Sequence, residues 1–308
     1  MSGLRFPPGL LATCCLPWTE RYELDEPVFR RAIQTALRGT KGLYLFGTAG
    51  EGYAVTDRQF ARAVEVFGEE MGRVGAEPMV GLIDLSLGRL RERLDLARSL
   101  GVRLFQVVLP SWGALSDREV DRFFQVVCDG YTDCRFLHYN LPRAKRVLTG
   151  ADYARLAARH GNLVATKNTG DSLSLLRGLL TEAPQLTHFL SEQGYVYGSQ
   201  LGECGILASF VMNWPRLWAL YEAGRRGDLR TLAAMSRELD QLLATLFEAV
   251  PAGRMDGTYD KLFEKLYDRE FSLRLLPPYE GASDAEFERF AQLLAERLPQ
   301  WCPPPEAV

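Results

Sequence analysis

The chain has 308 residues, of which 47% are hydrophobic and 24% charged, and its formal net charge is −3. This balance is that of a soluble globular protein, and the lack of a strongly basic stripe argues against nucleic acids and anionic membranes as partners. Because no run approaches the ~20 apolar residues of a membrane helix, no signal peptide is evident and the six cysteines form no CxxC pair, we expect a cytoplasmic protein with a small-molecule ligand.

Short runs rich in apolar, β-branched or aromatic residues predict strands, and segments with apolar residues at three- and four-residue steps predict helices between them. Strands are expected at residues 10–17, 42–47, 78–84, 104–110, 134–140, 163–168, 187–193 and 204–209, with helices such as 57–74, 87–100 and 117–129. After about residue 225 the alternation ends. Helices are then expected at 228–249, 258–270 and 283–298, followed by an irregular tail over 301–308.

This order predicts an α/β protein with a closed (β/α)8 TIM barrel and a C-terminal helical extension. Continuous apolar strands that alternate with amphipathic helices indicate a parallel sheet covered on its outer face, and eight such units are typical of a closed barrel. An open doubly wound sheet is the alternative, but the first strand–helix turn lacks a dinucleotide fingerprint. We expect a barrel domain over residues 1–225 that carries the site, and a helical bundle and tail over residues 226–308.

Lys167 is the one lysine within the eight predicted strands. Burial at an apolar strand end disfavours the charged form of an amine and lowers its pKa from an ordinary value of about 10.4. A neutral amine attacks a ketone carbon and forms an imine, whereas a solvated surface lysine stays protonated. The alternative is a lysine whose stem covers the strand end while its ammonium group reaches water.

A glycine-rich segment follows the second predicted strand, at the end where barrels of this type build their sites. Residues 47–52 read Gly-Thr-Ala-Gly-Glu-Gly. Glycines allow a close backbone approach, and successive N–H groups can hold an anion such as a carboxylate. A purely structural turn is the alternative, because the spacing matches neither a P-loop nor a dinucleotide fingerprint.

The fifth predicted strand ends in His138-Tyr139-Asn140. Strand alternation places His138 and Tyr139 on opposite faces, so if Tyr139 points into the barrel mouth, His138 belongs to the core under the helices. Tyr139 lies one strand–helix–strand step before Lys167, which predicts that the phenol and the amine occupy adjacent strands. A phenol beside an amine can transfer protons; a hydrogen-bonded tyrosine that caps the barrel interior is the alternative.

Together, the glycine-rich turn, Tyr-Asn-x-Pro at residues 139–142 and Lys-x-x-Gly-Asp at residues 167–171 resemble the dihydrodipicolinate synthase / N-acetylneuraminate lyase family of class I aldolases. The resemblance covers nearly the whole chain. It implies a lyase without a metal or organic cofactor that acts on pyruvate or a 2-keto-3-deoxy sugar acid through a Schiff base, by aldol cleavage, condensation or dehydration. Lys167 is then expected to be the Schiff-base lysine and Tyr139 the general acid/base.

The same resemblance implies substrate contacts at two further segments. Thr48 and Ala49 are expected to hold the carboxylate of the keto acid. Gly205, Ile206 and Leu207, on the eighth predicted strand, are expected to close the pocket around it.

Departures from the family pattern bear on the second substrate. Residues 110–112 read Pro-Ser-Trp where the synthases carry Pro-Tyr-Tyr with a relay tyrosine, and Ala144 stands at the position of their carboxylate-binding arginine, with Arg143 beside it. At the seventh strand Glu192 supplies one carboxylate where sialic-acid lyases carry two. We expect Trp112, Arg143 and Glu192 to belong to the specificity region, and dihydrodipicolinate synthase activity stays an alternative.

The missing relay tyrosine also keeps a non-enzymatic alternative open, a 2-keto acid sensor or decayed paralogue on the same fold. The histidines stand on separate predicted elements without metal-ligand spacing, which argues against a metal site. Trp112, Trp214 and Trp218 offer apolar surface for subunit contacts, and the family resemblance implies a homo-oligomer, either a dimer or a homotetramer.

Overall fold

The computed structural model describes residues 5–209 and 213–304, and its centre is a closed barrel of parallel strands. Each strand pairs with the next, and β8 pairs back onto β1. The strands are β1 (Leu10–Cys14), β2 (Leu43–Leu45), β3 (Met79–Leu82), β4 (Leu104–Val107), β5 (Arg135–Asn140), β6 (Leu163–Asn168), β7 (Thr187–Leu190) and β8 (Gly205–Ala208). The β1–β8 pairing confirms the barrel and excludes the open sheet.

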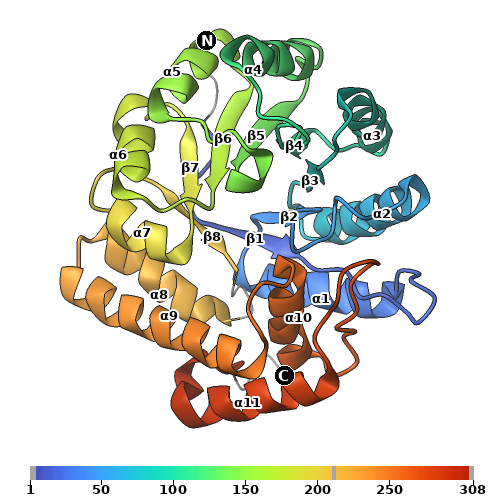
Figure 1. Cartoon of the computed structure of the whole chain (residues 1–308), viewed down its shortest axis with the longest axis vertical. Helices are drawn as coiled ribbons and strands as arrows, with labels where there is room; N and C mark the ends of the chain where they lie inside the picture. Colours follow the sequence, from blue (N-terminus) through green and yellow to red (C-terminus); the bar gives the residue numbers. More distant parts are fainter. Residues whose placement is uncertain (1–4, 210–212, 305–308) are drawn as a thin grey trace.

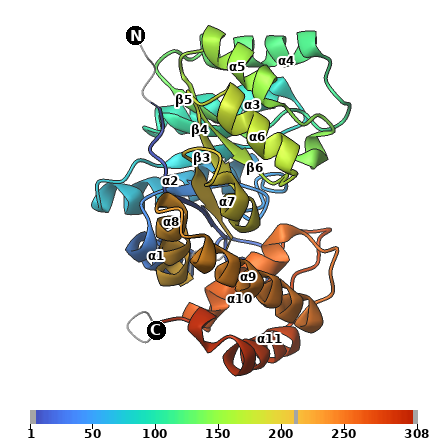
Figure 2. The same cartoon turned by 90° about the vertical axis from the view of Figure 1, so that its left-hand side faces the viewer.

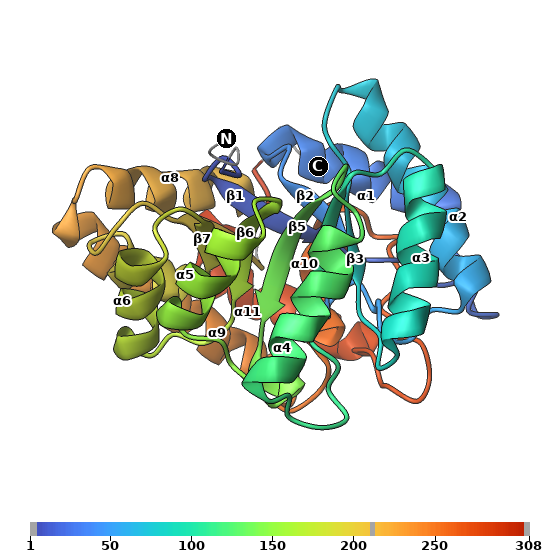
Figure 3. The same cartoon turned by 90° about the horizontal axis from the view of Figure 1, so that it is seen from above.

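Helices alternate with the strands and cover the outside of the barrel (Figures 1 and 3). They are α1 (Glu26–Gly39), α2 (Asp57–Arg73), α3 (Leu87–Ser99), α4 (Asp117–Phe124), α5 (Gly150–Arg159), α6 (Leu173–Glu182), α7 (Glu192–Gly198) and α8 (Trp214–Arg225). A π-helical turn, η1 (Gln125–Asp129), continues α4, and a 3-10 turn, η2 (Pro142–Ala144), follows β5.

Both faces of the strands are buried, which is why they read as continuous apolar runs. Inward-facing residues such as Leu11, Tyr44, Leu137 and Phe189 fill the barrel interior. The outward-facing residues join the larger layer under the helices. His138 lies in that outer layer, where its Nδ1 atom is 2.6 Å from the Tyr153 hydroxyl, and it is the core histidine that alternation predicted.

The seventh strand is shorter than the sequence pattern indicated. It ends at Leu190 because Ser191 caps the next helix: the Ser191 hydroxyl accepts a hydrogen bond from the Gly194 backbone N–H at 2.9 Å. Glu192 therefore stands in the first turn of α7 rather than on a strand. The change of secondary structure sets the direction in which the Glu192 carboxylate leaves the backbone.

The C-terminal extension consists of α9 (Leu229–Ala249), α10 (Asp256–Tyr267), α11 (Asp284–Arg297) and a 3-10 turn, η4 (Pro299–Trp301). Helix α9 packs against α7, α8 and α11, and Figure 2 shows the extension to one side of the barrel. No helix among the described residues combines the length and apolar character needed to cross a membrane.

The start of the expected irregular tail is ordered and buried. Trp301 is 1% exposed, and its indole N–H donates to Glu238 Oε2 at 2.9 Å. The prediction of an irregular segment was wrong at this residue, because the hydrophobic indole packs under α9 and α11. Residues 305–308 lie outside the described part of the chain.

Candidate active site

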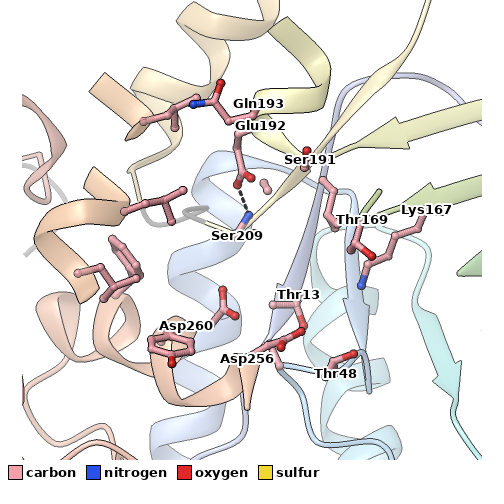
Figure 4. A pocket seen from close by; sticks show the side chains of 18 of the residues that line it. Thr13, Thr48, Lys167, Thr169, Ser191, Glu192, Gln193, Ser209, Asp256 and Asp260 are labelled. Atoms are coloured by element: carbon pink, nitrogen blue, oxygen red, sulfur yellow. Dashed lines mark hydrogen bonds between the residues drawn. The ribbon is translucent and has the colours of Figure 1, made fainter. Parts of the chain in front are cut away.

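A cavity of about 400 Å³ lies at the carboxyl ends of the strands, where barrels of this type place their sites (Figure 4). The barrel and its loops line one side, and α9 and α10 close the other. The barrel side includes Thr13, Tyr44, Thr48, Ala49, Tyr139, Lys167, Thr169, Glu192 and Leu207, and the helical side includes Leu239, Leu243, Phe247, Asp256, Tyr259, Asp260 and Phe263.

Lys167 reaches this cavity from β6 and is 3% exposed. Its Nζ atom is hydrogen-bonded to the Tyr44 hydroxyl at 2.7 Å and lies 3.7 Å from the centre of the Tyr139 ring. Burial lowers the pKa of Lys167 to about 7, although the negative charges of Asp256 and Asp260 act in the opposite direction. A substantial fraction of the amine is therefore neutral at physiological pH.

Tyr139 stands beside Lys167 on the adjacent strand, as its spacing predicted. The two residues are register partners of β5 and β6. The Tyr139 hydroxyl lies 3.3 Å from Thr48 Oγ1, and burial raises the pKa of Tyr139 to about 12, so the phenol keeps its proton at neutral pH. A protonated phenol next to the amine can give a proton to a developing anion and take it back later.

Tyr44 is a site residue that the sequence analysis missed. It lies at the middle of β2, and burial raises the pKa of its hydroxyl well above the ordinary value. Gly47 makes room for it, since a Cβ at that position would meet the Tyr44 ring at 2.4 Å. A strand tyrosine three residues before a glycine-rich turn was the available signal, but strand alternation alone does not say which face meets the cavity.

The glycine-rich turn after β2 is held by a buried carboxylate. Glu51, which is fully buried and has a φ of 55°, accepts hydrogen bonds from Trp18 Nε1 at 2.8 Å and from the Leu276 backbone N–H at 2.6 Å. It also pairs with Lys261 of α10 at 2.6 Å. These contacts join the turn that carries Thr48 and Ala49 to the C-terminal extension.

Helix α10 brings two unpredicted carboxylates into the cavity, Asp256 and Asp260. Its first turn lies directly against the glycine-rich turn, since a Cβ on Gly257 would come within 2.8 Å of the Ala49 carbonyl oxygen. Glu192 adds a third carboxylate from α7, and its Oε1 atom accepts from the Ser209 backbone N–H at 2.6 Å. Figure 4 shows Glu192 and Asp260 across the cavity from Lys167, and Asp256 nearer to Thr13 and Thr48.

The predicted residues fall into two groups. Lys167, Tyr139, Thr48, Ala49, Glu192 and Leu207 line the cavity. The others lie elsewhere: Gly205 and Ile206 precede Leu207 on β8, Trp112 is 84% exposed on the loop after β4, and Arg143 forms a two-point ion pair with Asp256 at 2.9 and 3.2 Å. Arg143 therefore contacts the site indirectly, through its ion pair with Asp256 of the cavity wall.

Comparisons with known proteins place the chain in a family. The dihydrodipicolinate synthetase family matches residues 7–255 of the chain. An N-acetylneuraminate lyase of Escherichia coli (strain SMS-3-5 / SECEC) is 23% identical over 248 residues, covering 78% of this chain and 82% of the relative. A 4-hydroxy-tetrahydrodipicolinate synthase of Exiguobacterium sibiricum is 26% identical over 239 residues, covering 76% of this chain and 80% of the relative.

Solved structures show the same fold. The prophage protein YagE of Escherichia coli K12, in complex with pyruvate, superposes with a TM-score of 0.83 at 22% identity, covering 94% of this chain and 98% of that one. The Clostridium difficile protein CdNal, in complex with mannosamine, has a TM-score of 0.82 at 15% identity, with 94% and 99% covered. Because the family match extends over most of the chain and the barrel is complete, this protein is a member of the dihydrodipicolinate synthetase family.

Proposed function

We propose that the protein is a Schiff-base-forming lyase that acts on pyruvate or a 2-keto-3-deoxy acid. The observation that carries the proposal is Lys167, a buried amine with a pKa of about 7 that faces the cavity and touches two tyrosines. Such an amine is nucleophilic because a large fraction of it is unprotonated at neutral pH. The relatives named as lyase and synthase support the same reaction class.

In the proposed reaction, the neutral Lys167 amine attacks the C2 ketone and forms an imine with loss of water. The turn at Thr48 and Ala49 holds the substrate carboxylate through its N–H groups and hydroxyl. The protonated imine accepts the electrons of a bond at C3, so that this bond breaks or forms through an enamine. Tyr139 supplies or removes the proton that this step requires.

Three broader features belong to the same proposal. The protein acts in the cytoplasm, as its cysteine pattern and composition led us to expect, and it assembles as a homo-oligomer, as the family resemblance implies. The barrel domain ends near residue 225, where α8 ends and α9 follows. The active site is then shared by both domains, because α9 and α10 line the cavity.

A reductive trapping experiment tests the proposal. Pyruvate with sodium borohydride is expected to add one reduced pyruvyl group to the parent protein, and peptide mapping is expected to place it on Lys167. Lys167→Ala should stay unlabelled, whereas the control Lys41→Ala, which removes an exposed lysine, should label like the parent. Equal labelling of Lys167→Ala and the parent, or no labelling of the parent, contradicts the proposal.

Trapping detects imine formation, which both an enzyme and a sensor would show. A turnover assay is therefore needed to distinguish the two. An enzyme releases pyruvate from 2-keto-3-deoxy sugar acids, or consumes it with an aldehyde, whereas a sensor forms the imine and stops there. Condensation of pyruvate with aspartate semialdehyde tests the synthase alternative in the same assay.

A further inference from the structure

The part of the cavity wall formed by α7 and α10 is rich in carboxylates. Asp256 and Asp260 are four residues apart on α10 and therefore lie on one face of that helix, and Glu192 of α7 lines the same cavity (Figure 4). Among the described residues that line the cavity, Lys167 is the sole basic one, while the acidic ones are Asp171, Glu192, Asp256 and Asp260. The described lining therefore presents four acidic groups and one basic group.

Asp256, Asp260 and Glu192 differ in the hydrogen bonds and ion pairs that they make within the protein. Asp256 is neutralised by the two-point pair with Arg143, and Glu192 accepts the Ser209 backbone N–H. Asp260 makes no hydrogen bond or salt bridge with any residue in the described part of the chain. Burial and the neighbouring charges of Asp256 and Glu192 raise the pKa of Asp260 well above its usual range, so this carboxyl holds a proton more readily than an exposed aspartate does, and a neighbouring cation would favour its ionised form.

Such a group is a ready acceptor for a ligand. A hydroxyl or ammonium donor placed against Asp260 would supply the missing hydrogen bond, and an ammonium group would also relieve the repulsion among the acids. A second carboxylate or a phosphate at the same place would add to the repulsion among Asp256, Asp260 and Glu192, and Lys167 is the one basic group among the described residues of the lining.

We propose that Asp260 is a specificity residue that binds the end of the substrate remote from the imine, and that this end carries hydrogen-bond donors, hydroxyl or ammonium, and no second anionic group. The inference rests on the proposed function for the position of the reacting carbon. It goes beyond it in naming the substrate class and the residue that selects it.

The test compares aldehydes of equal length in condensation with pyruvate. Glyceraldehyde carries hydroxyls, 3-aminopropanal an ammonium group and malonate semialdehyde a carboxylate. For the parent, kcat/KM with the better of the two donor aldehydes is expected to exceed that with malonate semialdehyde by at least about tenfold, because a site that hydrogen-bonds a substrate donor discriminates strongly against an analogue that lacks it. The relative rates of the two donor aldehydes tell hydroxyl from ammonium.

Asp260→Asn and a matched control decide the role of the residue. The asparagine is nearly isosteric and is expected to reduce the preference to within about threefold. Glu288→Gln, on α11, removes one negative charge from an exposed ion pair with Arg269 and should leave the preference unchanged. A parent that prefers the anionic aldehyde, or an Asp260→Asn variant with the parent's preference, overturns the inference.

A binding measurement tests the inference independently of the proposed function. If the parent forms no trapped imine with pyruvate, the proposed chemistry fails, but ligand-observed NMR still compares 1,3-propanediol, 1,3-diaminopropane and malonate. Saturation transfer to a donor compound that Asp260→Asn abolishes upholds the acceptor role. Transfer to malonate alone, or to all three compounds equally in parent and variant, overturns it.

Discussion

At the scale of single residues, the lowered pKa of Lys167 reduces the stability of the folded protein, and the same lowered pKa makes the amine reactive. Its pKa of about 7 lies well below that of an exposed lysine, so the folded protein holds a proton less tightly than the unfolded chain does. Between about pH 7 and pH 10.4 the unfolded chain binds a proton that the folded protein lacks, and the penalty from this residue falls as the pH rises through that window. Stability and reactivity thus oppose each other at one atom.

A lowered pKa alone does not identify a functional group, as His138 demonstrates. Burial lowers the pKa of His138 to about 3, yet the ring lies in the outer layer of the core against Tyr153. Lys167 differs because its amine faces a cavity and has a phenol at its side. Geometry distinguishes the two residues where electrostatics does not.

The first prediction concerns the pH dependence of imine formation. Since the neutral amine reacts, the rate of trapping by pyruvate and cyanoborohydride should rise with pH and reach half of its maximum near pH 7. Asp260→Asn removes a charge that raises the Lys167 pKa, so its midpoint should move to lower pH. A rate that keeps rising toward pH 10 would indicate an ordinary solvated lysine.

The second prediction separates the two tyrosines. Tyr139→Phe should still form the imine but should slow turnover by roughly 10²- to 10⁴-fold, because a positioned proton donor is lost. Tyr44→Phe removes the hydroxyl that is bonded to Lys167 Nζ, and should alter the pH midpoint of trapping as well as the rate. Steady-state kinetics and trapping profiles of both variants check this; an undiminished rate in Tyr139→Phe would assign proton transfer to another group.

At the scale of elements, α10 joins the C-terminal extension to the barrel mouth. Its Lys261 is fully buried and pairs with Glu51, 210 positions earlier in the chain. Burial lowers the pKa of Lys261, while the Glu51 charge acts in the opposite direction. The pair holds the glycine-rich turn and the acidic wall in one arrangement.

The third prediction follows from that pair. Lys261→Met should lower the free energy of unfolding by about 3–5 kcal/mol, because it leaves the Glu51 carboxylate buried without its cation. The double variant Glu51→Gln/Lys261→Met should recover part of this loss. Arg269→Gln, which breaks an exposed pair with Glu288, should change stability by at most about 1 kcal/mol. Denaturant unfolding measures all three, and a Lys261→Met loss no larger than the control would contradict the structural role.

The limits of sequence reasoning lie at these same elements. Lys167 and Tyr139 could be predicted because strand period and the β–α–β repeat place them on adjacent strands at one end of a barrel. Asp256 and Asp260 could not, because a helical pattern gives a face but not a position. The place of α10 depends on contacts of Lys261 with Glu51 and of Gly257 with Ala49, between segments far apart in the chain.

At the scale of the whole molecule, the aromatic residues expected at subunit contacts have different surroundings. Trp214 and Trp218 are half-buried on α8, and the Trp218 indole N–H donates to the Gly39 carbonyl oxygen at 2.7 Å within the same chain. Trp112 stands out at 84% exposure, while its backbone oxygen accepts from Lys145 Nζ at 2.8 Å. Tryptophan is enriched at protein interfaces, which makes this exposed indole the residue on which we base a subunit contact.

The last prediction is therefore that the protein assembles through the loop of Trp112. Light scattering in dilute neutral buffer should give a mass of two or four times 34.6 kDa. Trp112→Glu should lower this mass, because a charge replaces an apolar contact. Leu229→Glu, at an exposed leucine in the first turn of α9, is the control and should leave the mass unchanged. Because a two-fold contact brings the same loop of both subunits together at the catalytic ends of the barrels, weaker assembly should also lower activity; a monomeric parent with full activity would rule out both the assembly and its link to the site.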